Sequence, residues 1–145
     1  MPGIVVGIDG SPNSGRALDW AMRQAAAVHA PLTVLTVHEV AKSYWGGIPV
    51  TGPADAPLLE KLQQAAEEMT HKAASQLGDA QPASVHVRAL TGFVVRELVD
   101  ASQDADLVVV GSRGGGGFGR LLMGSVSNEV VQHSACPVVV VPHER

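Results

Sequence analysis

The positions of hydrophobic and polar residues along the chain predict a regular succession of strands and helices. Short apolar runs rich in β-branched residues are typical of buried strands, whereas apolar residues three or four positions apart are typical of one helix face. From Ser84 to Leu90 apolar and polar residues alternate, which is typical of a half-exposed strand near a sheet edge. The expected strands are Ile4–Ile8, Leu32–Val37, Ser84–Leu90, Leu107–Val110 and Val138–Val141.

Helical spacing fills the segments between these runs. Ser11 followed by Pro12 is typical of an N-cap and a first helical residue, and Pro31 ends the helix that follows. Gly78 occupies the position of a C′ glycine after the second helix. Residues 41–57 contain several glycines and prolines, so we expect a long irregular loop there. The expected helices run from Pro12 to His29, from Leu58 to Leu77, from Thr91 or Gly92 to about Ser102, and from Val126 to His133.

Strands that alternate with helices predict an α/β fold with a parallel sheet. We expect residues 1–145 to form a single domain, in which a Rossmann-like, doubly wound sheet carries helices on both faces. A ligand then binds at the carboxyl ends of the strands, where the winding reverses. If the first and fourth strands are neighbours at that point, Asp9 and the glycine-rich stretch after Val110 face each other across one crevice.

The composition narrows the class of protein. The formal net charge is -4 and the basic residues are scattered, which argues against a nucleic-acid-binding surface. No apolar run approaches the roughly 20 residues needed to cross a bilayer, and the chain opens directly on a strand. The single cysteine, Cys136, excludes an internal disulfide framework. We therefore expect a cytoplasmic protein that binds neither nucleic acid nor membranes.

The candidate chemistry lies in the glycine-rich stretch from Gly111 to Ser127. Glycine allows a ligand to approach the main chain closely, and a loop between a strand and a helix N-terminus often binds a phosphate. The alternative is an ordinary surface loop. A Walker A motif is excluded, because Gly119 is followed by Arg120 and Leu121 in place of the lysine and the hydroxyl residue. Gly114, Gly116 and Gly119 match the dinucleotide-binding fingerprint Gly-x-Gly-x-x-Gly in spacing. The match is not meaningful, because this fingerprint should follow the first strand and here it follows the fourth.

Gly111, Gly114 and Gly124 followed by Ser125 form the spacing Gly-x2-Gly-x9-Gly-Ser. This spacing resembles the nucleotide-binding signature of the universal stress protein family, in its ATP-binding branch. The resemblance extends over nearly the whole chain, from the opening strand and turn to the closing stretch Cys136–Val141. It implies a five-stranded parallel sheet with the strand order 3-2-1-4-5.

The resemblance also implies roles for individual residues. Asp9 would contact the adenosine part of ATP, and the backbone of Val37 would bond the adenine. Gly111 and Gly114 would line the path of the ribose and phosphates. The group from Gly124 to Ser127 would hold phosphates at the last helix, where backbone N–H groups and the helix dipole favour an anion. The residues implied in nucleotide binding are Asp9, Gly10, Ser11, Val37, Gly111, Ser112, Arg113, Gly114, Gly124, Ser125, Val126 and Ser127.

Several of these residues also have a purely structural interpretation. Asp9 is also a common turn-former after a strand, and Ser125 is also a suitable N-cap. Arg113 and Arg120 either neutralise phosphate charge or are simply solvated. The six histidines have no zinc spacing, so Mg²⁺ arriving with the nucleotide is the metal that we expect. Cys136 is expected to be a packed thiol rather than a nucleophile.

The resulting hypothesis is a nucleotide-dependent stress-response regulator or sensor that binds ATP with Mg²⁺. One alternative is a cAMP-binding member of the same family, because the loop suits one phosphate as well as three. A second is a slow ATPase, or autophosphorylation on Ser125 or Ser127, and a third is an interaction module that binds no nucleotide. The apolar strand Val138–Val141 is an edge candidate, and this strand mediates homodimers in the family, so we expect a homodimer.

Overall fold

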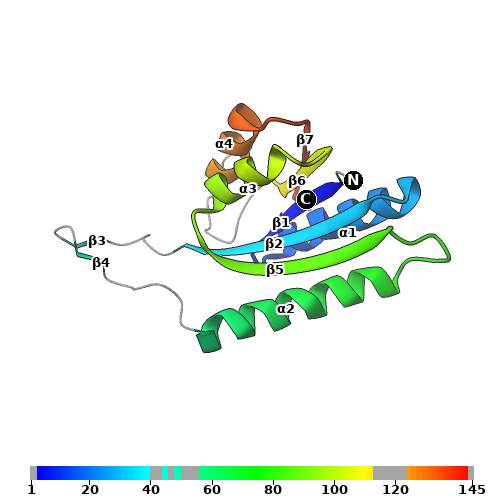
Figure 1. Ribbon diagram of the computed structural model, residues 1–145, viewed down its shortest axis with the longest axis horizontal. Helices are drawn as coiled ribbons and strands as arrows, with labels where there is room; N and C mark the ends of the chain where they lie inside the picture. The colour runs from blue at the N-terminus through cyan, green and yellow to red at the C-terminus, as the bar shows by residue number, and fades with distance from the viewer. Residues whose placement is uncertain (1–2, 40–43, 46–47, 50–55, 113–123, 144–145) are drawn as a thin grey trace.

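A computed structural model of the chain describes residues 3–39, 44–45, 48–49, 56–112 and 124–143. Within these residues a five-stranded sheet is covered by helices, and a separate pair of very short strands lies between β2 and α2 (Figure 1). The elements are β1 (Ile4–Ile8), α1 (Pro12–Val28), β2 (Pro31–Glu39), β3 (Tyr44–Trp45), β4 (Ile48–Pro49), α2 (Ala56–Ser75), β5 (Ser84–Gly92), α3 (Val94–Ser102), β6 (Leu107–Gly111), α4 (Ser125–His133) and β7 (Val138–Val141).

The main sheet is parallel throughout, with the order β5-β2-β1-β6-β7. Counted within this sheet along the chain, the order is 3-2-1-4-5, which confirms the expectation. β1 is the central strand, where Val6 pairs with Val34 on one side and Val109 on the other. The winding therefore reverses at β1, and the carboxyl ends of β1 and β6 border the crevice at which such sheets bind ligands.

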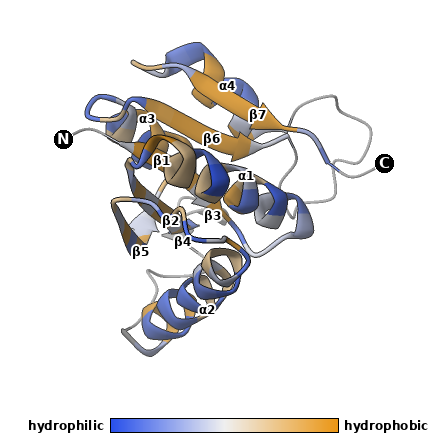
Figure 2. Cartoon of the chain, turned by 90° about the vertical axis from the view of Figure 1, so that its right-hand side faces the viewer, coloured by the Kyte–Doolittle hydropathy of each residue, from blue (hydrophilic) through white to orange (hydrophobic). Residues whose placement is uncertain are grey.

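Each face of the sheet carries its own half of the core, because successive residues of a strand point to opposite faces. Val6 packs with residues of α1 and α2, whereas its neighbour Val5 packs with residues of α3 and α4. Figure 2 shows the hydrophobic strands β1, β6 and β7 enclosed by helices whose outer surfaces are hydrophilic. The helices thus cover both faces of the sheet, as the sequence predicts. The helix residues buried deepest in the two halves are Ala17, Leu18, Ala21, Met22 and Ala25 on one face, and Leu98 and Val130 on the other.

β2 and β5 extend further toward their carboxyl ends than the hydrophobic pattern predicts. Their ladder continues as far as the pair Glu39–Gly92. α3 consequently begins at Val94, and the expected start at Thr91 or Gly92 is wrong. Pairing between the two strands keeps this stretch extended, which overrides its local helical spacing.

Two predictions around the second helix also differ from the structure. α2 ends at Ser75 rather than Leu77, because its last turn tightens and Leu77 donates its N–H to Ala74. Gly78 therefore lies beyond the helix end and does not adopt the positive φ of a C′ glycine. Within the expected irregular loop 41–57, β3 and β4 form a short antiparallel pair, and the rest of that stretch before α2 lies outside the described residues.

Gln63 on α2 occupies part of the outer edge of β5. Its Nε2 donates to the carbonyl oxygen of Val87 at 2.8 Å, and its Oε1 accepts the N–H of Ala89 at 2.8 Å. A residue of a further parallel strand would make the same pair of bonds to two alternate residues of β5. An unpaired strand edge promotes pairing with other chains, so this side chain both anchors α2 and protects the edge.

We expect Gln63→Leu to lower the free energy of unfolding by about 1–3 kcal/mol, because two half-buried backbone groups lose their partner. Urea denaturation followed by circular dichroism measures this loss. Gln64→Leu, on the exposed neighbour, is the matched control and should stay within about 0.5 kcal/mol of the parent chain. Equal losses in the two variants would show that the contact with β5 contributes no stability.

Candidate functional site

The turn after β1 places Asp9 at the carboxyl edge of the sheet. Its Oδ1 accepts the N–H of Ser11 at 2.9 Å, and its own N–H donates to the Oγ of the buried Ser14 at 3.2 Å. Gly10 follows with φ 84°, a left-handed conformation that favours glycine. Asp9 is therefore a turn residue, and the same hydrogen bonds fix its exposed carboxylate beside the crevice.

β2 supplies the second wall of this crevice. Its ladder with β1 ends at the pair Ile8–Thr36, whereas its ladder with β5 continues through Val37 to Glu39. From Val37 onward, the side of β2 that faces β1 is paired with no other strand among the described residues. The Val37 side chain packs into the α3 and α4 half of the core, so the backbone is the part of this residue at the crevice.

Of the helices that begin at this edge, α1, α3 and α4 differ in how their first N–H groups are satisfied. The first N–H groups of any helix lack an acceptor within the helix. In α1 the Oγ of Ser11 accepts the N–H of Ser14 at 3.2 Å, as the N-cap prediction requires. In α3 the Oε1 of Glu39, at the end of β2, accepts the N–H of Val94 at 3.2 Å.

α4 begins differently. Its N-cap is Gly124, and among the described residues no side chain caps the helix. Ser125 is the first helical residue, so the interpretation of Ser125 as the N-cap is wrong. Among the described residues, the N–H groups of the first turn of α4 therefore lie at this edge without a capping side chain, an arrangement that favours anion binding.

Ser112 and Gly124, the two described residues on either side of positions 113–123, are joined by a hydrogen bond. The N–H of Gly124 donates to the carbonyl oxygen of Ser112. The Oγ of Ser127 donates to the carbonyl oxygen of Gly124 at 3.0 Å and lies 3.4 Å from that of Ser112. These bonds hold the start of α4 beside the end of β6. The intervening residues 113–123, which include the predicted Arg113 and Gly114, lie outside the described residues.

Gly111 is required by packing rather than by an unusual backbone angle. It ends β6 opposite Val141, and a Cβ at this position would lie 3.1 Å from both Cγ and Oδ1 of Asn13. The buried Asn13 belongs to the first turn of α1, so a small residue at position 111 lets that helix approach the end of β6.

The predicted hydroxyl residues are placed in different environments. Ser125 is exposed in the first turn of α4, whereas Ser127 is 2% exposed and Ser112 is 4% exposed. The Oγ of Ser112 donates to the Oδ1 of Asn13 at 3.4 Å and accepts the N–H of His143 at 3.1 Å. Val126 is half-buried against the α3 and α4 half of the core. Of these hydroxyl groups, that of Ser125 is the one presented at the surface.

The described part of the chain contains neither a candidate metal cluster nor a candidate membrane span. Over those residues, no three side chains of His, Cys, Asp or Glu gather as a metal site would require. None of the described helices combines the length and apolar composition of a membrane span. The half-buried Cys136 packs against the core with its Sγ 3.4 Å from the carbonyl oxygen of Pro137.

The sequence model of the universal stress protein family matches residues 2–142. The chain belongs to this family. A universal stress protein of Mycolicibacterium smegmatis is 37% identical to it over 143 residues, which cover 96% of this chain and 47% of that protein. Universal stress protein Rv2623 of Mycobacterium tuberculosis is 36% identical over 146 residues, covering 98% of this chain and 48% of that protein. The chain therefore spans about half the length of the curated relatives it matches.

Solved structures of universal stress proteins share the fold. UspA from Lactobacillus plantarum superposes with a TM-score of 0.74 at 22% identity, covering 97% of each chain. A universal stress protein solved in complex with cAMP gives a TM-score of 0.66 at 30% identity, covering 97% of this chain and 96% of that one. One from Archaeoglobus fulgidus in complex with dAMP gives 0.65 at 20% identity, covering 97% and 98%.

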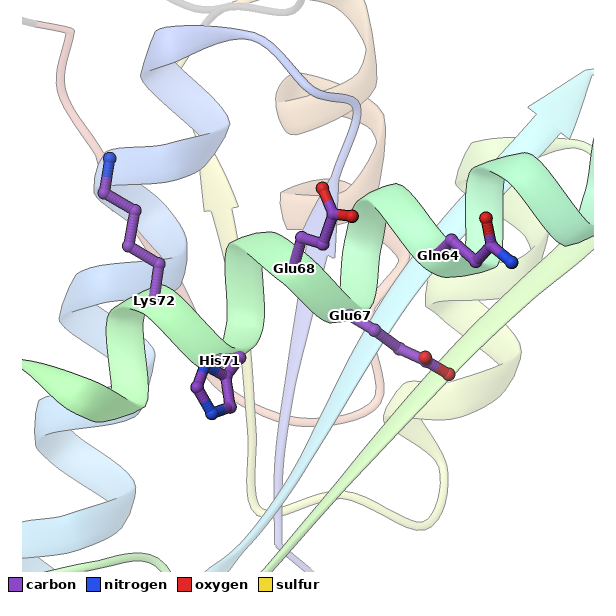
Figure 3. Close-up of a pocket in the computed structure, with 5 residues that line it drawn as sticks. All are labelled: Gln64, Glu67, Glu68, His71 and Lys72. Carbon is purple, nitrogen blue, oxygen red and sulfur yellow. The ribbon is translucent and has the colours of Figure 1, made fainter.

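A separate hollow on this universal stress protein domain lies along the outer surface of α2. It is lined by Gln64, Glu67, Glu68, His71 and Lys72. Figure 3 shows that these side chains diverge from the helix instead of converging on one point. The hollow therefore has no arrangement of groups that would bind a ligand, and the candidate site stays at the carboxyl edge of the sheet.

Sequence reasoning missed Asn13 and Glu39 as structural parts of this edge. Asn13 falls in the turn-rich stretch after β1, where asparagine is common for local reasons. Glu39 follows the expected end of its strand. Both act through partners more than fifty positions away in sequence, at Val141 and Val94, so no local pattern identifies them.

We expect Gly111→Ala to lower the free energy of unfolding by about 1–3 kcal/mol, because the added methyl group overpacks against Asn13. Gly78→Ala is the matched control, since a Cβ at Gly78 meets nothing within 4 Å. Its effect should stay within about 0.5 kcal/mol. Urea denaturation of both variants distinguishes them, and a Gly111→Ala chain as stable as the control would contradict the packing requirement.

Proposed function

We propose that this universal stress protein domain binds an adenine nucleotide at the carboxyl edge between β1 and β6, with ATP and Mg²⁺ as its ligand. The proposed activity is that of a nucleotide-dependent regulator or sensor in the stress response. The observation that carries this proposal is the start of α4, which has no capping side chain among the described residues. α1 and α3 satisfy their first turns with Ser11 and Glu39, whereas α4 offers its first N–H groups to an anion from outside.

Two relatives support an adenine nucleotide as the class of ligand. The relative at 30% identity was solved with cAMP, and the more distant one from Archaeoglobus fulgidus with dAMP. Both ligands combine an adenine with a phosphate, which suits a crevice that has a free backbone flank at one end and a helix start at the other. cAMP is therefore the second candidate ligand. With ATP, the phosphates would carry the Mg²⁺, which phosphate oxygens and water coordinate readily.

The proposed roles follow the geometry of the edge. Asp9 contacts the adenosine part, and the backbone of Val37 bonds the adenine where β2 leaves its ladder with β1. The backbone N–H groups from Ser125 to Ser127 receive phosphate oxygens, and the exposed hydroxyl of Ser125 adds a donor. Gly111 and Gly114 line the path between these two ends.

We expect Mg-ATP to bind the parent chain, as measured by titration calorimetry, with cAMP titrated in parallel. Ser125→Glu places a carboxylate at the first position of α4, where it interacts with the helix dipole and repels phosphate. This variant should bind nucleotide at least about tenfold more weakly, equivalent to ~1.4 kcal/mol, while its thermal stability is kept.

Gln132→Glu is the control for that substitution, because it makes the same charge change on the exposed surface of α4, in its last turn. Its affinity should remain within about twofold of the parent value, since screening weakens charges more than about 10 Å apart. Absence of heat with both nucleotides rejects the proposed function. Tighter binding of cAMP than of Mg-ATP transfers the proposal to cAMP, and equal affinity in the two variants rejects the phosphate position at α4.

We also propose that the domain forms a homodimer through β7. β7 is an edge strand of the sheet, and its four valines are buried only in part except for Val141. The carbonyl oxygens of Pro137 and Val141 accept hydrogen bonds from β6. Because N–H and C=O directions alternate along a strand, the backbone groups of Val138 and Val140 point away from β6. These outward groups are available for pairing with a second copy.

We expect analytical ultracentrifugation to give a dimer for the parent chain at micromolar concentration. Val140→Pro removes an outward N–H without breaking a bond to β6, so it should weaken the dimer at least about tenfold while the monomer stays folded. The far-ultraviolet circular dichroism spectrum checks the fold. A monomeric parent chain, or a dimer unaffected by this substitution, contradicts the proposed interface.

A further inference from the structure

Ser112 joins four segments of the fold through its backbone and its side chain. Its N–H donates to the carbonyl oxygen of Val141 at 2.9 Å, and its carbonyl oxygen accepts the N–H of Gly124. Its Oγ donates to the Oδ1 of Asn13 and accepts the N–H of His143. The end of β6, the start of α4, the first turn of α1 and the end of β7 therefore meet at one buried residue.

Asn13 makes the second connection of this cluster. Its Nδ2 donates to the carbonyl oxygen of Val141 at 3.3 Å, and its Oδ1 accepts the hydroxyl of Ser112 at 3.4 Å. Its side chain lies against Gly111, where a Cβ would displace it. Asn13 is 8% exposed and Ser112 is 4% exposed, so both polar side chains are directed into the protein rather than into the crevice.

The chain beyond β7 is held by the same group of contacts. Arg16, one turn after Asn13 on α1, donates its Nε to the carbonyl oxygen of Pro142 at 3.1 Å. His143 donates its N–H to Ser112. Contacts with α1 and with Pro142 and His143 thus fix the position of Ser112. Through Ser112 they also fix the position of Gly124.

We propose that Asn13 and Ser112 are positioning residues of the nucleotide site. Together they fix the carbonyl oxygen of Ser112, which holds the N–H of Gly124 and so orients the first turn of α4 toward the phosphate. They also link that turn to Val141 and His143, so that nucleotide binding and the order of the chain after β7 depend on each other. This inference rests on the proposed nucleotide binding and assigns its positioning residues.

The direction of the link follows from thermodynamic reciprocity. If loss of the Asn13 contacts weakens nucleotide binding by loosening this cluster, nucleotide binding must tighten the cluster by the same factor. In the parent chain the nucleotide should therefore slow hydrogen exchange at the N–H groups of Ser112 and His143. In an Asn13→Ala chain that protection should be smaller. A residue that only stabilised the fold would leave the nucleotide-dependent part of the protection unchanged.

The test compares the parent chain with Asn13→Ala, Ser112→Ala and the double variant. The titrant is Mg-ATP or cAMP, whichever binds the parent chain more tightly. Each single substitution should weaken binding by about three- to tenfold, the range expected from the loss of one or two hydrogen bonds. The double variant should lose little more affinity than the single variant that binds nucleotide more weakly, because the two residues act through one shared contact.

Ser75→Ala is the matched control, because the exposed Ser75 hydroxyl donates to the carbonyl oxygen of Lys72 within α2, away from the candidate site. Its nucleotide affinity should equal that of the parent chain. Thermal unfolding without nucleotide identifies any variant that fails to fold. Hydrogen exchange at His143 in the nucleotide-free Ser112→Ala and Asn13→Ala chains then tests the cluster itself, and faster exchange than in the parent chain is expected.

The outcomes separate the two proposals. No binding by the parent chain rejects the proposed function and this inference with it. Binding by the parent chain with unchanged affinity in the variants, or strictly additive losses, rejects only the positioning role. Unchanged exchange at His143 in both single variants rejects the link to the chain after β7.

Discussion

The hydrogen bond from the N–H of Gly124 to the carbonyl oxygen of Ser112 is the contact on which the candidate site depends. It brings together two residues that flank a stretch of eleven positions, 113–123, and it sets α4 beside the end of β6. Without it, the parallel ladder would still place Asp9 and Ser112 at one edge, but the first turn of α4 would be held there only by core packing and by the hydroxyl of Ser127. The buried hydroxyl of Ser127 supports the same junction from within the helix, because it donates to the carbonyl oxygen of Gly124.

Glycine has three different uses around this edge, and the sequence shows only that glycine is abundant. Gly10 adopts a left-handed backbone that other residues tolerate poorly, whereas Gly111 leaves room for Asn13. Gly124, with φ -70°, needs neither exception for its backbone, and as the N-cap residue it offers α4 no capping side chain of its own. For the proposed phosphate site this matters, because Ser, Asp or Asn at the same place would cap the helix and compete with a ligand.

The fold could be predicted from the sequence because each strand is a short apolar run and each crossover is helical, and the resemblance to the universal stress proteins supplied the strand order. The ends of the elements were less predictable. Pairing between β2 and β5 extends both strands as far as Glu39 and Gly92, whereas the residues after Leu90 have helical spacing. The amide contacts of Gln63 and Asn13 were missed for a related reason. Each is a pair of long-range hydrogen bonds made by one polar side chain, and hydrophobic periodicity contains no signal for them.

The cap that Glu39 provides to α3 has a consequence for the electrical character of the edge. It neutralises one helix start with a carboxylate from the end of β2, while the start of α4, on the other side of β1, keeps its partial positive charge. The two helix starts therefore differ: among the described residues, that of α3 is matched by a carboxylate, whereas that of α4 is matched by none. For an elongated ligand with an uncharged ring at one end and an anion at the other, this difference favours the direction that places the anion at α4. The orientation of a bound nucleotide would then be selected before any contact specific to adenine is made.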